Sequence, residues 1–239
     1  MPLPGPQTLA ATTDADIIGY GGAAGGGKTD LICGLSLTEH QRTIIYRKEG
    51  TQLEGITDRF EEIIGPGYIS GQPKVCKFEG KKIEFAGLTD PNSHKKYQGR
   101  PHDLKCFDEA TEIEEYKVRF LMGWKRSSDP NQKMRVLMTF NPPTTAEGEW
   151  VIEYFGPWLD PNHSNPAAPG ELRYYTTDPE TGKDMECDGP EPIILEGEEV
   201  YPESRTFIPA KVEDNPYYME SGYKSTLQGL PEPLRSQML

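Results

Sequence analysis

The sequence has no apolar run long enough to cross a bilayer, and only 35% of its 239 residues are hydrophobic. The N-terminal residues Met1-Pro2-Leu3-Pro4 include neither the basic nor the apolar segment of a secretory signal peptide. We therefore expect neither a membrane span nor an export signal. At this length we expect one α/β domain with a modest core and long loops, because glycine and proline are abundant.

Cysteine and histidine are scarce and scattered. The four cysteines, Cys33, Cys76, Cys106 and Cys187, form no C-x-x-C pair, and the four histidines show no metal-ligand spacing. The first three cysteines fall within expected helices or strands, where buried free thiols are typical of a reducing compartment. The sequence therefore predicts neither a zinc site nor a disulfide framework.

Positive charge is also in short supply, because 25 Lys and Arg oppose 38 Asp and Glu for a net charge of −13. Tight binding of nucleic acid depends on neutralising phosphates, so the composition argues against a domain that grips nucleic acid strongly by itself. A motor that needs only local basic contacts is still allowed. Much of the acidity lies between Asp178 and Glu203, where we expect a solvated surface. Lys95-Lys96 is the only local basic cluster near the candidate site described next.

Glycine, by contrast, is concentrated in one loop that fits the pattern G-x-x-x-x-G-K-[ST]. A short apolar run at 16–20 predicts a strand before the loop, and residues 30–35 predict a helix after it, which is the context of a phosphate-binding P-loop. The backbone N–H groups of such a loop and the helix N-terminus form an anion site. The candidate nucleotide-binding residues here are Gly22, Ala23, Ala24, Gly25, Gly26, Gly27, Lys28, Thr29 and Asp30. Lys28 is expected to reach the terminal phosphates, and the Thr29 hydroxyl to bind Mg²⁺.

A second motif follows the expected strand 104–107, where Asp108 and Glu109 stand side by side. This arrangement resembles a Walker B strand, in which Asp108 would hold Mg²⁺ and Glu109 would polarise the attacking water. An Asp-Glu pair also occurs on ordinary surfaces, so the motif gains its meaning from the P-loop upstream. A glutamate in this place is typical of additional-strand ATPases, and the absence of an N-K-x-D motif favours ATP over GTP.

A third motif closes the expected strand 135–140. Thr139 and Asn141 could lie beside the γ-phosphate and report its loss, or Asn141-Pro142 could simply cap the strand. The spacing leaves these two interpretations open. Among the arginines, Arg100, Arg47 and Arg126 are candidates for a cation that reaches the γ-phosphate of a neighbouring subunit.

The periodicity of the chain predicts alternating strands and helices, and hence a mostly parallel sheet flanked by helices on both faces. The fold class expected is a P-loop NTPase of the additional-strand, RecA-like type. Residues 1–15 are expected to form an irregular lead-in, 1–145 the nucleotide-binding core, and 146–239 an extension that completes the same domain. Further strands are expected at 43–46, 75–78, 82–86, 172–176, 193–195 and 205–208, and further helices at 52–64, 112–124, 150–158 and 216–230.

Taken together, several short motifs resemble the large terminase subunits of tailed double-stranded DNA bacteriophages, which package viral genomes. Besides the P-loop and Asp108-Glu109, the resemblance rests on the runs at 97–100, 124–127, 141–143, 206–210, 214–216 and 230–233. It implies an ATPase that uses ATP and Mg²⁺ to drive double-stranded DNA into a procapsid. In this family a glutamine before the P-loop strand contacts adenine, and Gln7 matches that position. Thr139 and Asn141 match the coupling motif, and Arg100 lies where an arginine finger acting in trans is expected.

The resemblance also implies partners and a location. These are the portal protein and procapsid, the small terminase subunit, and a homo-oligomeric ring of five copies, with a monomer expected for the isolated chain, all in the host cytoplasm. Family members continue into a nuclease domain, but the acidic residues after Thr145 fall in expected turns. We therefore expect an ATPase-only fragment, or a protein whose nuclease lies elsewhere. Two other functions stay open, namely a different additional-strand ATPase such as a helicase, and a nucleotide-gated assembly module without turnover.

Overall fold

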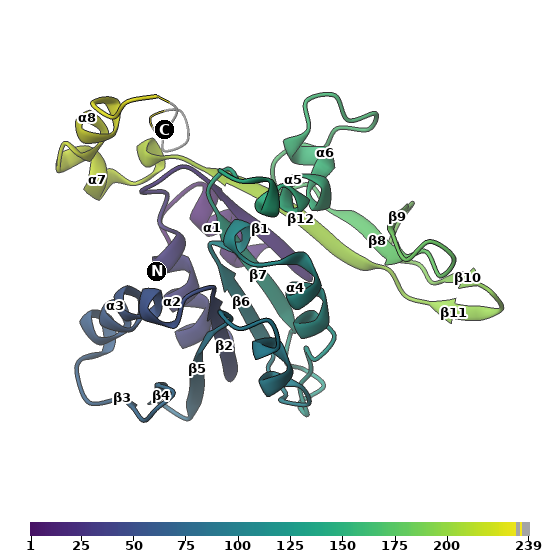
Figure 1. The fold of residues 1–239 in the computed structure, drawn as a ribbon, viewed down its shortest axis with the longest axis horizontal. Helices are drawn as coiled ribbons and strands as arrows, with labels where there is room; N and C mark the ends of the chain where they lie inside the picture. Colours follow the sequence, from purple (N-terminus) through teal and green to yellow (C-terminus); the bar gives the residue numbers. More distant parts are fainter. Residues whose placement is uncertain (233–234, 236–239) are drawn as a thin grey trace.

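A ten-stranded sheet runs through the molecule, and all but two of the strands belong to it (Figure 1). The structure is a computed structural model that describes residues 1–232 and 235, so Pro233, the last residue of the run at 230–233, lies outside it. The strand order is β3-β4-β5-β2-β6-β7-β1-β12-β8-β9, and β10 pairs with β11 separately. The strands are β1 Ile17–Gly22, β2 Arg42–Arg47, β3 Ile69–Ser70, β4 Val75–Phe78, β5 Lys81–Gly87, β6 Leu104–Asp108, β7 Arg135–Phe140, β8 Arg173–Thr177, β9 Asp184–Cys187, β10 Ile193–Leu195, β11 Glu198–Val200 and β12 Glu203–Ala210.

The six central strands, from β5 to β12 in the sheet order, are parallel, whereas the hairpins at both edges are antiparallel. The P-loop strand β1 is separated from β6, which ends at Asp108, by the intervening strand β7. This inserted strand defines the additional-strand class and confirms the predicted fold. Because the central strands are parallel, the residues that follow β1, β2, β6 and β7 meet at one edge of the sheet.

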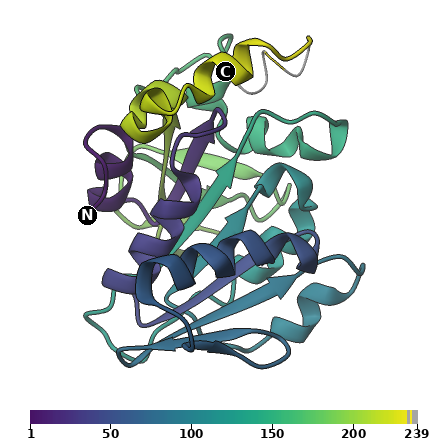
Figure 2. The same ribbon diagram turned by 90° about the vertical axis from the view of Figure 1, so that its left-hand side faces the viewer.

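Helices cover both faces of the sheet, as expected for α/β connections. On one face α2 and α3 bury Leu31, Ile32, Ile56 and Phe60 against the strands (Figure 2). On the other face, α4 and α5 contribute a second cluster that includes Leu121. The helices are α1 Pro6–Thr12, α2 Lys28–Thr38, α3 Glu54–Ile64, α4 Glu115–Met122, α5 Trp150–Tyr154, α6 Gly156–Leu159, α7 Pro216–Glu220 and α8 Tyr223–Gln228.

Four local expectations were wrong, and one of them is the single helix expected at 150–158, which is two helices, α5 and α6. The lead-in contains a helix, α1, which starts at Pro6, a residue well suited to a first helical turn because it has no N–H to satisfy. The single helix expected at 216–230 is two helices, interrupted at Gly222, whose φ of 74° is left-handed. The short strands β9 and β11 were not expected. Each pairs with a neighbour in a hairpin, and their acidic sequences show little strand preference.

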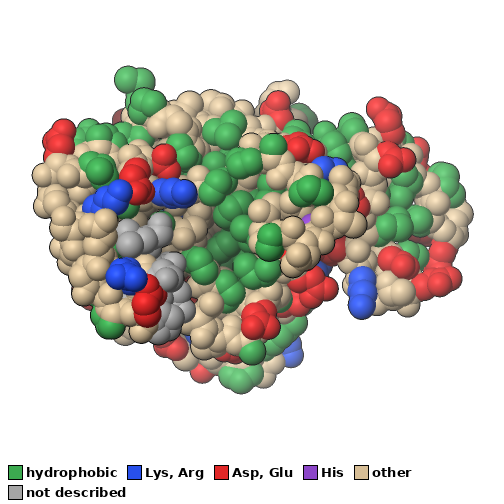
Figure 3. Space-filling view, turned by 90° about the horizontal axis from the view of Figure 1, so that it is seen from above, with side chains coloured by type: hydrophobic (Ala, Val, Ile, Leu, Met, Phe, Trp, Pro, Cys, Tyr) green, Lys and Arg blue, Asp and Glu red, His purple; other side chains and the backbone are tan. Residues whose placement is uncertain are grey.

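Other expectations from composition agree with the structure. Cys33, Cys76 and Cys106 are buried free thiols, and Cys187 is half-buried. Within the part of the chain that the structure describes, no helix is long and apolar enough to cross a membrane. The acidic region forms an arm that extends beyond the sheet, with β10 and β11 at its tip (Figure 1). Seen from above, this end of the molecule carries mostly acidic side chains (Figure 3).

Candidate nucleotide-binding site

The glycine loop follows β1 and enters α2 at Lys28, as the motif predicts. Gly27 has a φ of 77°, and a Cβ added there would lie 2.8 Å from Nε2 of Gln7. A side chain at Gly21, one residue before the motif, is excluded more strongly, because its Cβ would lie 1.8 Å from the carbonyl oxygen of Phe140. Glycine is therefore required at both positions, by backbone conformation at one and by close strand packing at the other.

Four side chains donate hydrogen bonds to four carbonyl oxygens of this loop. Lys28 Nζ donates to Ala23 O at 3.0 Å, Asn215 Nδ2 to Gly25 O at 3.1 Å, Tyr20 Oη to Gly26 O at 2.8 Å, and Gln7 Nε2 to Gly27 O at 3.0 Å. Because the carbonyl groups are held by these donors, the loop amides are left to face an anion. This is the orientation that phosphate binding requires.

Gln7 and Asn215 come from far apart in the sequence but both support the loop. Gln7 is 5% exposed, and its Oε1 accepts a hydrogen bond from the Leu3 amide. The structure thus gives both polar atoms of Gln7 backbone partners. The adenine contact implied by the family resemblance stays a prediction. The loop contact of Asn215 was not foreseen, since no local signal connects residue 215 with the P-loop.

Lys28 Nζ also donates to Asn141 Oδ1 at 2.5 Å. Burial lowers the pKa of Lys28, while the nearby Glu109 and Asp108 act in the opposite direction. Lys28 is thus half-buried beside two acids, and an amide oxygen accepts one of its protons. The structure places Asn141 in contact with the P-loop lysine. A residue that only caps the strand would not need this contact, so the contact favours a position beside the phosphates.

Asp108 is 1% exposed and both of its oxygens are occupied. Oδ1 accepts a hydrogen bond from Thr139 at 2.5 Å, across the β6–β7 register in which these two residues are direct partners. Oδ2 accepts from Arg47 Nε at 2.7 Å, and Arg47 Nη2 lies 2.6 Å from the same oxygen. Thr139 and Asn141 therefore serve the two motifs separately, Thr139 holding Asp108 and Asn141 holding Lys28.

Glu109 directly follows β6 with φ 52° and ψ 55°, a left-handed conformation that is rare for a residue with a side chain. Such strain is concentrated at functional sites, where the surrounding structure maintains it. Burial raises the pKa of Glu109, and Asp108 adds to this effect while Lys28 opposes it. Glu109 is thus a half-buried carboxyl group beside the P-loop lysine.

The arginine candidates lie in different places. Arg47 is in the site of its own chain, which the sequence did not reveal, because the position of β2 next to β6 cannot be read from local patterns. Arg100 lies over the ring of Tyr97 and 3.4 Å from Glu84 Oε1. It contacts none of Lys28, Asp108 and Glu109 in the described chain, so a role in trans stays a prediction. The carboxylate of Asp30 binds Arg59 of α3 at 2.7 Å.

The residues present fit a Mg²⁺ ion held jointly with a nucleotide. In the described part of the chain, no three His, Cys, Asp or Glu side chains gather to form a metal site of their own. Mg²⁺ commonly keeps several waters and uses only one or two protein groups plus phosphate oxygens. Thr29, in the first turn of α2, has a hydroxyl with no hydrogen-bonding partner among the described residues, and the Asp108 carboxyl group lies close to the adjacent Lys28.

Residues 68–177 match the family model for the phage terminase large subunit. This segment, somewhat less than half of the chain, is similar to the phage terminase large subunit family. The match includes Asp108 and Glu109 but ends well short of the acidic tip of the arm. No curated protein matches the sequence.

Solved terminase structures share the fold. The large terminase of a thermophilic bacteriophage superposes with a TM-score of 0.61 at 16% identity, covering 99% of this chain and 52% of that protein. A second structure of the same phage's terminase, in complex with ADP, gives 0.59 at 15% identity, covering 100% and 52%. The ATPase domain of the Thermus phage P74-26 large terminase gives 0.54 at 14% identity, covering 98% and 91%. This chain thus spans about half the length of the first terminase and has the fold of a terminase ATPase domain.

Proposed function

We propose that this chain binds and hydrolyses ATP to drive double-stranded DNA into a viral procapsid. The observation that carries the proposal is the position of Glu109, a half-buried, strained carboxyl group that follows Asp108 and lies close enough to Lys28 to affect its pKa. A hydrolytic site needs a base held beside the phosphate-binding lysine, and this arrangement supplies one. The similarity of residues 68–177 to the terminase model and the terminase ATPase fold support the same conclusion.

The chain's own residues divide the work. The amides of the loop 22–29 and the Lys28 ammonium would bind the phosphates, and Thr29 and Asp108 would hold Mg²⁺, which neutralises charge on the phosphates. Glu109 would accept a hydrogen bond from the attacking water and orient it. The raised pKa of Glu109 makes it a better base than an ordinary glutamate once it is ionised.

Asn141 is the residue we propose to couple the site to movement. In the structure its Oδ1 accepts a hydrogen bond from Lys28. Lys28 cannot keep this contact unchanged while it turns to a bound phosphate, so Asn141 exchanges partners when nucleotide binds. Because Asn141 begins the loop after β7, that exchange is transmitted to a segment outside the P-loop.

The partners of the proposed motor are duplex DNA, the portal protein on the procapsid, the small terminase subunit and further copies of the chain in a ring, for which we propose five members. The reaction takes place in the host cytoplasm. Arg100 is proposed to reach the nucleotide of a neighbouring copy, and Gln7 to contact adenine. We further propose that residues 1–239 form one ATPase domain.

The substitution Glu109→Gln tests the catalytic assignment. We expect nucleotide binding to be retained and hydrolysis to fall by about 10²-fold or more, because the amide cannot act as a base. The matched control is Glu112→Gln, an exposed residue of the next turn, which should keep its turnover. Hydrolysis is measured with procapsids, portal and DNA present. Unchanged turnover in Glu109→Gln would refute the assignment, and ATP-dependent assembly without any turnover would instead support a nucleotide-gated assembly module.

A further inference from the structure

One face of this acidic protein is basic. Its cations lie around β5, the turn at 93–97 and the segment after α4, and they are the half-buried Lys82 and the exposed Lys95, Lys96, Arg100 and Arg126. We call these five residues the basic face. Three of them are linked by contacts, since Lys82 and Arg100 both pair with Glu84, and Arg126 donates to the carbonyl of Gly99. Lys95 and Lys96 lie in the turn that also carries Tyr97, whose ring contacts Arg100. Two carboxylates, Glu84 and Asp90, are paired with members of the face, so it keeps an excess of positive charge.

Two features make the basic face more than scattered surface charge. The guanidinium groups of Arg100 and Arg126 lie over the rings of Tyr97 and Trp124, at 5.3 and 5.6 Å from the ring centroids, which restricts their motion. Beneath them Lys105 is fully buried, and its Nζ has no hydrogen-bonding partner. A buried cation without a hydrogen-bonding partner increases the local positive charge. A negatively charged surface that binds there would stabilise this charge.

The acidic arm has the opposite character. Nine Asp and Glu residues but only one lysine lie between residues 178 and 200, so this segment carries eight of the thirteen net negative charges. Two large apolar side chains are exposed on the arm, Ile194 at 67% and Tyr201 at 66%. Apolar anchors inside a charged rim are the usual composition of a protein-binding surface.

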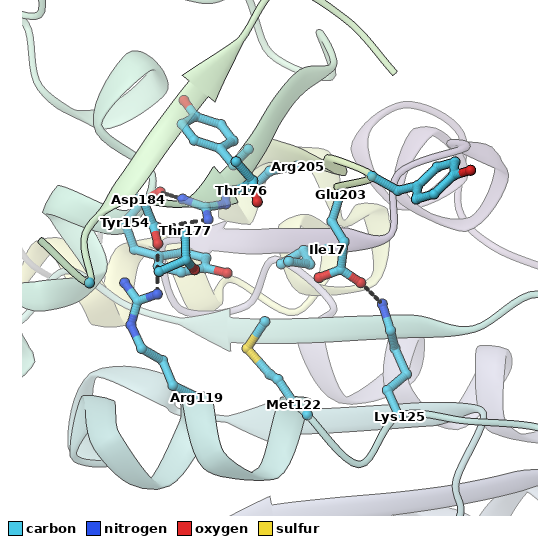
Figure 4. A pocket seen from close by; sticks show the side chains of 14 residues that line it. Ile17, Arg119, Met122, Lys125, Tyr154, Thr176, Thr177, Asp184, Glu203 and Arg205 are labelled. Carbon is cyan, nitrogen blue, oxygen red and sulfur yellow. Dashed lines mark hydrogen bonds and ion pairs between the residues drawn. The ribbon is translucent and has the colours of Figure 1, made fainter. Parts of the chain in front are cut away.

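The base of the arm is held firmly to the core (Figure 4). Asp184 accepts from Arg119 of α4 at 2.7 Å and from Arg205 of β12 at 2.8 Å. The Arg205 guanidinium lies between the rings of Tyr154 and Tyr175, at 3.5 and 4.1 Å from their centroids. These contacts surround a cavity of about 510 Å³ whose charged groups are already paired. The arm therefore projects in a defined direction, and the cavity serves its attachment.

We propose that the acidic arm of one copy docks on the basic face of a second copy. The two surfaces lie toward opposite edges of the sheet, because β5 is third from one edge whereas β8 and β9 form the other. In Figure 1 the arm points away from the side that carries β3, β4 and β5. A contact between different surfaces of identical copies is heterologous, and it closes into a ring when the rotation permits. The inference names the interface of the proposed ring and rests on that part of the proposed function.

Duplex DNA is the competing occupant of the basic face, and the observations favour the second copy. The arm carries eight net negative charges, so it repels a duplex that lies beside it, whereas the basic face of a second copy attracts the same charges. The arm also brings exposed apolar groups, which a DNA backbone cannot match. A protein surface can pair with the charges of the arm and can also cover its exposed apolar side chains.

The test compares two charge reversals in the full chain. One variant lowers the net negative charge of the arm from eight to four, by Glu191→Lys with Glu198→Lys, and the other replaces two cations of the face by carboxylates, by Lys95→Glu with Arg126→Glu. All four side chains are exposed, and circular dichroism confirms the fold. Sedimentation velocity at low and high salt measures self-association. At concentrations above those at which the isolated chain is expected to be monomeric, we expect salt-sensitive association of the wild type and a loss of about tenfold or more in each variant. Mixing the two variants should restore association, since the unaltered arm of the face variant then meets the unaltered face of the arm variant.

The control Glu54→Lys with Asp58→Lys changes the net charge as the arm variant does, on an exposed part of α3, and should associate like the wild type. The inference is overturned if the wild type stays monomeric at every concentration and salt, if mixing restores nothing, or if the control fails equally. It is also overturned if the face variant loses affinity for a duplex oligonucleotide, measured by anisotropy, while its self-association is unchanged. None of these outcomes depends on hydrolysis, so failure of the ATPase assignment is seen separately in the Glu109→Gln experiment.

Discussion

Arg47 and Asp108 form a buried ion pair in which both Nε and Nη2 of the guanidinium lie within 2.7 Å of one carboxylate oxygen. The pair joins the ends of β2 and β6, two neighbouring strands of the sheet. A carboxylate as buried as Asp108 requires a compensating partner, and Arg47 supplies it at the place where we propose that Asp108 serves a metal ion.

Arg47→Gln should lower the free energy of unfolding by about 3 kcal/mol, because it leaves Asp108 as an unpaired buried charge. Adding Asp108→Asn should restore part of the loss, since the second substitution removes the unpaired charge. Chemical denaturation of both single variants and the double variant completes a thermodynamic cycle. Strictly additive losses would show that the two side chains do not stabilise each other.

Gln7→Ala distinguishes support of the loop from recognition of the base. The structure has Gln7 Nε2 bound to Gly27 O, so its loss should weaken ATP and GTP binding alike, by about fivefold for one hydrogen bond. The adenine contact that we propose for Gln7 adds a further loss for ATP, so the variant should then lose more affinity for ATP than for GTP. Titration with both nucleotides measures the ratio directly.

Lys105→Met should stabilise the protein near neutral pH. Burial lowers the pKa of Lys105 from 10.5 to about 8, so the unfolded chain binds more protons between these values and stability rises with pH through this range. Below pH 8 the full penalty of the buried charge is present, up to about 3 kcal/mol. Unfolding at pH 7 and pH 10 should show the variant more stable at pH 7 and a smaller difference at pH 10. Lys82→Met, on the basic face, is the control and should change little.

The apparent pKa of the acidic limb of the pH–rate profile should lie above the usual pKa of a glutamate. The raised pKa of Glu109 means that the base is lost by protonation as the pH falls through an elevated value, and bound phosphates act in the same direction. Glu112 contributes to that raised pKa, so Glu112→Gln should move the limb to lower pH while turnover at high pH is retained. A limb that does not respond to this substitution would assign the titration to another group.

The sequence predicted most of the central sheet because each strand is a short apolar run that ends in a turn or a polar motif. The P-loop and Asp108-Glu109 were located for the same reason, since their chemistry is local. Strand order is not local, and therefore the contact of Arg47 with Asp108 was missed although Arg47 itself was a candidate. Lys105 shows the same limit, because a lysine inside an apolar run gives no sign that it will be buried without a hydrogen-bonding partner.

The misjudged segments are those whose structure depends on distant partners. The helix α1 is short and begins with proline, yet it packs on the core through Ala10 and supplies Gln7 to the P-loop. The strands β9 and β11 exist because hairpin partners supply their hydrogen bonds, which local sequence preference does not report.

The strand β12 connects the two ends of the molecule. It begins at Glu203 beside the arm and ends at Ala210, which pairs in register with Gly22 of the P-loop. Its central residues are buried, and it pairs in register with β1 from Arg205 to Ala210. A shift of one end of β12 is therefore passed along the strand to its other end. If a neighbour on the arm alters the affinity of the loop for nucleotide, then thermodynamic reciprocity requires nucleotide to alter the affinity for the neighbour by the same factor. A single strand would then let the binding of ATP and the order of subunits in the ring regulate each other.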